Sequence, residues 1–141
     1  MKTITLILIS FLFLTGVSEA KEVSYLQYRN DVSYEVNSET PYTGKLVELH
    51  WNGKKKRQHN YKNGKQEGLS TLWNDNGQKI LETTYKNDKA DGLATGWYAS
   101  GQKKGEHNYK NGKKDGLSTW WDKNGQKKGE ATYKDGELYK K

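Results

Sequence analysis

The sequence contains no cysteine, a single proline and few aliphatic side chains. Without cysteine the chain has no disulfide, no cysteine-linked lipid and no thiol-based metal site or chemistry. After the first 20 residues it holds 14 valine, isoleucine and leucine residues against 15 tryptophan and tyrosine residues. Together with a formal net charge of +7, so low an aliphatic content is typical of disordered chains. It excludes a thick hydrophobic core, and with it a buried active site or a polytopic membrane protein.

The first 20 residues have the pattern of a targeting segment. Lys2 precedes an apolar stretch from Ile4 to Leu14, and small residues at Ser18 and Ala20 follow. This arrangement predicts a secretory signal peptide over residues 1–20, cleaved near Ala20, and therefore an exported protein that is periplasmic or secreted. The alternative is a retained membrane anchor, but the apolar run is shorter than the roughly 20 residues that a spanning helix needs.

Tyrosine and glycine recur at a fixed spacing in the rest of the chain. Columns 24 residues apart contain Tyr61, Tyr85, Tyr109 and Tyr133, and Gly44, Gly68, Gly92 and Gly116. Of the 14 glycines after residue 20, Gly96 alone falls outside such a column. Each unit has two turn signals, such as Asn63-Gly64 and Asn76-Gly77, which accept the positive φ angles of tight hairpins. The period predicts an all-β fold, an elongated single-layer antiparallel meander of serial β-hairpins with about nine strands between Lys45 and Lys140.

The even period keeps each column on one side of the sheet. Leu69, Thr71 and Trp73 share a face, as do His107 and Tyr109 with the glycine before them. We expect one aromatic face, whose rings cover neighbouring glycines, and one charged and wet face. This alternation is expected to break at a bulge near Glu67-Gly68 and its copies.

The segment 21–43 does not follow the period. It is predicted to be an N-terminal capping hairpin, turning at Asn30-Asp31, with a loop that leads into the repeats of residues 44–141. A repeat array needs such protection at its terminal edges.

The repeat unit from Tyr109 to Glu130, Tyr-Lys-Asn-Gly-Lys-Lys-Asp-Gly-Leu-Ser-Thr-Trp-Trp-Asp-Lys-Asn-Gly-Gln-Lys-Lys-Gly-Glu, resembles the MORN-repeat variant of bacterial proteins. The stretch from Tyr34 to Gly44 resembles the lead-in that often precedes those repeats. The resemblance implies serial hairpins in an elongated, twisted sheet. Many such proteins are named antitoxins of the YwqK family, and eukaryotic relatives are connected with membrane association and protein scaffolding. Export favours an immunity role outside the cytoplasm over neutralisation of a cytoplasmic toxin.

The titratable columns are predicted to be structural. His59 and His107 share a column with Thr83 and Ala131, which indicates a tolerant packing position and not a catalytic base or metal ligand. The acids Glu67, Asp91 and Asp115 each precede a glycine, which favours turns capped by side chains at backbone N–H groups. An open sheet offers no cleft for paired carboxylates, so no catalytic residue, metal ligand or cofactor is expected and the protein is predicted not to be an enzyme.

Two kinds of column suit a binding role. We predict an exported, non-catalytic module for protein–protein interaction, with an antitoxin-like or immunity role as one form of it. Its candidate partner-binding residues are Trp73, Trp97, Trp121, Trp120, Tyr85 and Tyr109. Trp51 and Trp120 lie outside the tryptophan column and are the better candidates for outward contacts.

The alternative is an electrostatic binder of anionic membrane lipid or cell-wall polymer. Its candidate anion-contacting residues are Lys62, Lys86, Lys110 and Lys134, although lysine also keeps such sheets soluble and their edges unpaired. Nucleic acid is not an expected partner, because the chain is exported and has 22 lysines but 2 arginines. The sequence also allows a homodimer in which two sheets pair edge to edge.

Overall fold

The structure is a computed structural model that describes residues 21–139. This part of the chain contains twelve strands and no helix, and hence no helix able to cross a membrane. Ten strands form one sheet in the order β1-β4-β5-β6-β7-β8-β9-β10-β11-β12, and β2 pairs with β3 in a separate hairpin. The predicted signal peptide lies outside the described residues.

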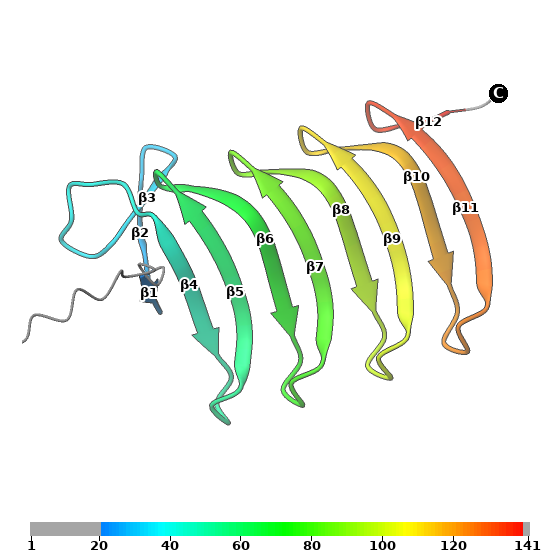
Figure 1. Cartoon of the computed structure of the whole chain (residues 1–141), viewed down its shortest axis with the longest axis horizontal. Coiled ribbons are helices and arrows are strands. Elements are labelled where there is room, and N and C mark those ends of the chain that lie inside the picture. Colours follow the sequence, from blue (N-terminus) through cyan, green and yellow to red (C-terminus); the bar gives the residue numbers. More distant parts are fainter. Residues whose placement is uncertain (1–20, 140–141) are drawn as a thin grey trace, which may run out of the picture.

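The repeats supply nine of the strands. They are β4 (Gly44–Leu49), β5 (Lys55–Lys62), β6 (Lys65–Trp73), β7 (Lys79–Lys86), β8 (Lys89–Trp97), β9 (Lys103–Lys110), β10 (Lys113–Trp121), β11 (Lys127–Lys134) and β12 (Glu137–Leu138). Each is antiparallel to the next, and the strands lie side by side in one layer (Figure 1). The predicted all-β meander of serial hairpins is therefore confirmed.

Two kinds of turn alternate along the sheet. At one end, here called the Asn-Gly end, both central residues have positive φ, as in Asn63 (50°) and Gly64 (78°). The copies are Asn87-Asp88, Asn111-Gly112 and Asp135-Gly136. This is the geometry of type I′ turns, whose twist matches that of the flanking strands. At the opposite end only the glycine has positive φ, and the Gly77 N–H donates to the Asn74 carbonyl at 2.9 Å.

A bulge interrupts each repeat where the sequence predicts one. His59 pairs with Ser70 and Tyr61 pairs with Gln66, so residues 67–69 together oppose Asn60. The side-chain amide of Asn60 donates to the Leu69 carbonyl at 2.7 Å, and so gives a partner to a backbone carbonyl that the bulge frees from the ladder. A second irregularity, which was not predicted, follows Leu72, where the register leaves Ile80 as an extra residue on β7.

The prediction of one aromatic and one charged face is wrong. Thr95 pairs with Glu106, whereas Ala94 pairs with His107, so the tryptophan and glutamate columns share a face that lies opposite the histidine and tyrosine columns. The reason is that each Asn-Gly turn pairs an odd-numbered residue with an even-numbered one, as Tyr61 with Gln66. We call the two sides the tryptophan face (Trp73, Trp97, Trp121) and the tyrosine face (Tyr61, Tyr85, Tyr109, Tyr133).

The sheet has almost no apolar interior. Among the described residues, Tyr42 and Ala94 are the buried apolar side chains, and the other buried side chains are small and polar. The latter are Ser33, Ser70, Thr71, Thr83, Thr95 and Ser118. Within residues 21–139 the sheet therefore has no thick core, as the sequence predicted.

The N-terminal segment closes one end of the sheet. β2 (Gln27–Arg29) and β3 (Val32–Tyr34) form a hairpin that turns at Asn30-Asp31, within the segment for which a hairpin was predicted. The Ser33 N–H donates to the Gly64 carbonyl at 2.8 Å, which ties the hairpin to the first Asn-Gly turn. β1 (Glu22–Val23) pairs in parallel with the start of β4, a contact that the sequence did not predict.

Candidate binding surfaces

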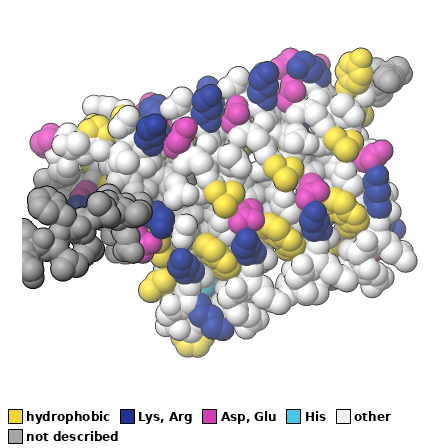
Figure 2. All heavy atoms as spheres, in the orientation of Figure 1, with side chains coloured by type: hydrophobic (Ala, Val, Ile, Leu, Met, Phe, Trp, Pro, Cys, Tyr) yellow, Lys and Arg dark blue, Asp and Glu magenta, His cyan; other side chains and the backbone are white. Residues whose placement is uncertain are grey.

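A lysine–tryptophan unit recurs on the tryptophan face. Lys79 Nζ lies 2.8 Å from Glu82 Oε1 and 6.0 Å from the centre of the Trp97 ring. Lys103 makes the equivalent contacts with Glu106 (2.6 Å) and Trp121 (5.8 Å). Figure 2 shows hydrophobic side chains alternating with paired basic and acidic ones along the sheet.

The second irregularity of each repeat builds this unit. Lys79 and Glu82 are three residues apart and would lie on opposite faces of a regular strand. Because the extra residue Ile80 shifts the register between them, both side chains reach the tryptophan face. In the next repeat, the same shift sends Lys104, the column partner of Ile80, to the tyrosine face.

Leucines make the tryptophan face accessible as an apolar surface. Leu69, Leu93 and Leu117 are 46%, 46% and 47% exposed, while the three tryptophans of this face are half-buried. The ammonium groups of Lys79 and Lys103 lie over the tryptophan rings, each paired with a glutamate. The result is an apolar stripe with charged margins that repeats on every second strand.

The tyrosine face carries a groove of about 500 Å³. Its lining includes Tyr85, Tyr109 and Trp120, together with Leu81 and small residues between them. The six predicted partner-binding residues are thus divided: Trp73, Trp97 and Trp121 lie on the tryptophan face, and Tyr85, Tyr109 and Trp120 line this groove.

The two tryptophans outside the column differ in their surroundings. Trp51 is 92% exposed in the turn between β4 and β5. Trp120 is 37% exposed, and its ring lies over Gly129, where an added Cβ would come within 2.9 Å of the ring. The prediction of an outward contact position therefore fits Trp51 better than Trp120.

The histidine column packs against the tyrosine face. His59 Nδ1 lies 2.7 Å from Ser70 Oγ on the neighbouring strand. Burial lowers the pKa of His59, and the nearby Arg57 lowers it further. Burial and Lys114 likewise lower the pKa of His107. Both imidazoles are therefore neutral packing groups at pH 7, and no three acidic or histidine side chains within residues 21–139 converge to hold a metal ion.

The acidic column caps the turns of the Asn-Gly end. The Asn87 N–H donates to Glu67 Oε2 and the Asn111 N–H to Asp91 Oδ2, both at 3.0 Å. The Lys134 ammonium and the Asp135 N–H both donate to Asp115, and these bonds lower the pKa of that carboxyl. The predicted role of these acids, the capping of backbone N–H groups, is confirmed.

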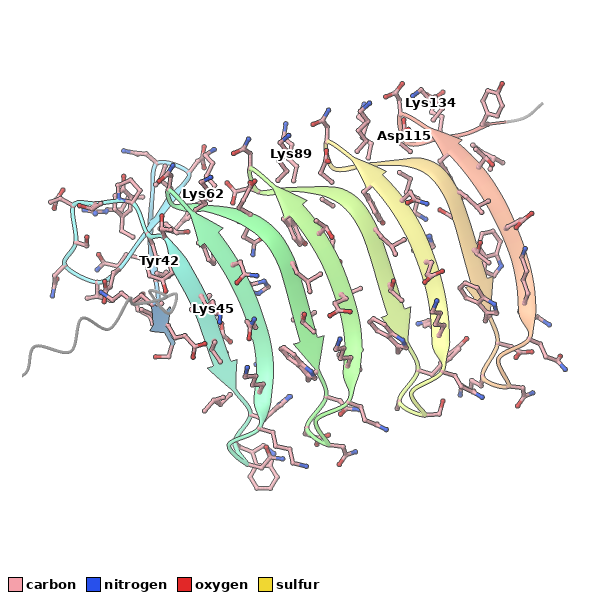
Figure 3. The ribbon with its side chains drawn as sticks, in the orientation of Figure 1. Tyr42, Lys45, Lys62, Lys89, Asp115 and Lys134 are labelled. Carbon is pink, nitrogen blue, oxygen red and sulfur yellow. The ribbon has the colours of Figure 1, made fainter. Side chains whose placement is uncertain are left out.

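The lysine columns border hollows between neighbouring turns. One hollow of about 520 Å³ is lined by Lys65, Lys86, Lys89 and Lys110, with Asp91 as its single acid. Lys62 lines the next hollow with Lys65 and Glu67, whereas Lys134 is paired with Asp115 at 3.0 Å. Figure 3 shows Lys62, Lys89 and Lys134 along this end of the sheet. The predicted lysine column therefore forms these hollows together with a second column, that of Lys65 and Lys89.

Comparison with known proteins identifies the repeat. The family model described as the MORN repeat variant matches residues 66–87, 90–111 and 114–135. Each match covers one hairpin, from β6–β7 to β10–β11, and ends in an Asn-Gly turn. Neither a curated protein nor a solved structure matches the chain.

Proposed function

We propose that this chain, which carries three MORN-variant repeats, is an exported binding module that contacts a protein partner through its tryptophan face. The observation that carries the proposal is the apolar stripe on that face, where leucines that are almost half exposed stand beside tryptophans whose rings lie beneath lysine ammonium groups. Such stripes mark interaction sites, and tryptophan is enriched among the residues that dominate binding energy. Proteins with MORN repeats are generally binding modules and not enzymes, which supports this role.

The spacing of the stripe favours an extended partner. Equivalent residues lie two strands apart, which is about 10 Å. A partner segment that crosses the strands therefore meets the same leucine–tryptophan unit repeatedly. An exported toxin neutralised by such contacts would make the module an immunity protein.

Capture of the partner tests this proposal. The chain carrying Trp97→Ala and Trp121→Ala should recover its partner from an envelope extract at least about tenfold less well than the unchanged chain, because each change removes a central ring. Tyr25→Ala, which removes an exposed aromatic ring of the N-terminal segment outside the stripe, is the control. Equal recovery by all three chains would argue against the tryptophan face.

Export has its own test. The signal-peptide pattern predicts that the protein in the envelope or medium begins at Lys21. N-terminal sequencing of the fractionated protein measures this, and a chain retained in the cytoplasm with Met1 would contradict it.

A second candidate function is the binding of an anionic lipid or cell-wall polymer at the Asn-Gly end. The hollow lined by four lysines and one aspartate favours it. Lys86→Glu with Lys110→Glu should remove sedimentation with phosphatidylglycerol vesicles, and added salt should do the same, because exposed charges are screened. The control is Lys123→Glu with Lys128→Glu, which reverses the same number of charges away from the Asn-Gly end. Binding that resists salt, or that both double variants lose equally, would exclude this function.

A further inference from the structure

The groove on the tyrosine face results from two glycines on neighbouring strands. A row across the sheet runs from Leu81 through Gly96 and Gly105 to Trp120, each residue paired with the next. In the neighbouring repeats, Leu72 and Trp120 occupy the column position of Gly96. The position of Gly105 is Leu81 in the repeat before it and Gly129 in the repeat after it. Gly96 and Gly105 therefore leave two paired positions without side chains, and Leu81 and Trp120 become the walls of the gap.

His107 gives this groove a polar group that the fold does not use. In the first repeat, His59 Nδ1 contacts Ser70 Oγ, but the equivalent atoms His107 Nδ1 and Ser118 Oγ are buried without a hydrogen-bond partner among the described residues. The His107 ring leans over Gly105, since its Nε2 lies 3.1 Å from where a Cβ would stand. The corresponding position beside His59 is Arg57, which leaves no such space. Gly105 thus both opens the groove and lets the imidazole line it.

The charge of the groove is one-sided. Its lining contains one charged side chain, that of Lys104, and no carboxylate. The glutamates of the same strands, Glu82 and Glu106, pair with Thr71 and Thr95 on the tryptophan face. A ligand with carboxylates beside an apolar group therefore matches the groove, whereas a basic ligand does not.

We propose that this groove is a second docking site, separate from the tryptophan face, for an acidic segment of a partner protein. The segment inserts one apolar side chain between Leu81 and Trp120, over Gly96 and Gly105. A flanking carboxylate contacts the Lys104 ammonium and accepts a hydrogen bond from His107 Nε2, the ring nitrogen that leans over Gly105. The volume of about 500 Å³ lies within the range of small binding sites, about 300–1,000 Å³.

A synthetic peptide tests the site without knowledge of the partner. The probe is a fluorescein-labelled peptide with one phenylalanine between two pairs of acidic residues, and its binding is measured by fluorescence anisotropy. Two control peptides carry alanine in place of phenylalanine, or lysine in place of each acid. Both controls should bind at least about tenfold more weakly than the probe, since each lacks one of the two matched features.

Two variants locate the binding. Gly96→Leu copies Leu72 of the neighbouring repeat into a site without positive φ, where an added Cβ meets nothing closer than 3.8 Å. It should keep the fold, checked by circular dichroism, and weaken the probe at least about tenfold by filling the groove. Lys104→Glu should weaken it too, whereas Lys128→Glu, in the same column but not in the groove lining, should not.

The outcomes separate this site from the tryptophan face. Probe binding that survives Trp97→Ala with Trp121→Ala and is lost in Gly96→Leu supports the groove. No binding of the probe, equal binding to Gly96→Leu, equal binding of the alanine peptide, or equal loss in Lys104→Glu and Lys128→Glu would each overturn it. Because those tryptophans lie on the opposite face, either site can fail without the other.

Discussion

Gly64 and Gly112 occupy the same column of the Asn-Gly turns but have different neighbours. Both have positive φ, 78° and 84°. A Cβ at Gly64 would lie 2.3 Å from Val32 Cγ1 and 2.8 Å from the Ser33 carbonyl oxygen, because the N-terminal hairpin packs against this turn. A Cβ at Gly112 would have its nearest neighbour at 3.8 Å.

The two alanine substitutions should therefore differ. Gly112→Ala should lower the free energy of unfolding by about 1–2 kcal/mol, the cost of a Cβ in the left-handed region. Gly64→Ala should cost about 1–3 kcal/mol more, since it also overpacks the hairpin. Urea denaturation measures both, and equal losses would show that the hairpin does not press on this turn.

The half-buried histidines His59 and His107 predict a dependence of stability on pH. Their pKa values are lower in the folded protein than the ordinary value of 6.5, so the unfolded chain takes up protons first as the pH falls. The two neutral imidazoles stabilise the fold fully above about pH 7.5. The free energy of unfolding then decreases as the pH falls through 6.5 towards the pKa of each histidine in the folded protein.

Column mates provide variants for this test. His59→Thr and His107→Ala place at each position a residue that the same column tolerates elsewhere, Thr83 or Ala131. The melting temperature of the unchanged protein should fall between pH 7.5 and pH 5.5 by more than that of the double variant. A difference of the same size in both proteins would assign the pH dependence to other groups.

At the scale of the hairpin, an acid from one repeat stabilises the turn of the next. Asp91→Ala removes the acceptor of the Asn111 N–H, which should cost about 1 kcal/mol, the usual effect of losing a side-chain cap. The control is Asp75→Ala, in an exposed turn at the other end, which should change stability by less than about 0.5 kcal/mol. Hydrogen exchange of the Asn111 amide should accelerate in Asp91→Ala and not in the control.

The hairpins themselves could be predicted from the sequence because their signals are local. Turn residues such as Asn63 and Gly64 fix both the φ angles and the end of each strand, so the nine strands followed directly. The bulge near Gly68 followed from the same column of glycines. β1 was missed because its two residues pair in parallel with residues 23 positions further along the chain, and nothing in a two-residue segment shows such a pairing.

The surfaces could be predicted less well because they depend on register between strands. Lys79 and Glu82 share a face through an irregularity that has no turn residue to reveal it. The groove needs Gly96 and Gly105 to be paired, and neither glycine alone indicates this. One signal was available: Gly96 is the glycine that departs from the repeat columns.

At the scale of the whole molecule, we expect that one full repeat of 24 residues can be removed without loss of the fold. Deletion of residues 89–112 takes out β8 and β9 and joins Asp88 to Lys113, the column partner of Lys89. The shortened chain should still fold and give the circular dichroism spectrum of a β-sheet protein, because each repeat contacts mainly its neighbours. Its urea midpoint should be lower, because one repeat and its contacts are lost.

Deletion of half a period is the matched control. Removing residues 89–100 leaves β9 in the place of β8, so its column residues meet the wrong partners. This chain should unfold or aggregate, as measured by size-exclusion chromatography. Equal stability of the two deletions would mean that the columns do not determine the fold.

The short strands at the two ends of the sheet have a consequence for growth. β4 has the same place in the repeat as β6, β8 and β10. The β4 of another copy is therefore the strand that would follow β11 if the sheet continued. However, β1 lies beside Lys45 and Leu46, and β12 beside Tyr133 and Lys134. Both occupy the plane of the sheet at the Asn-Gly end, which keeps β11 and a second β4 from the spacing of about 4.8 Å that pairing requires. A dimer through the uncovered part of an edge stays a prediction. The sheet is a series of equivalent hairpins with a short blocking strand at each end, so the number of repeats determines its length.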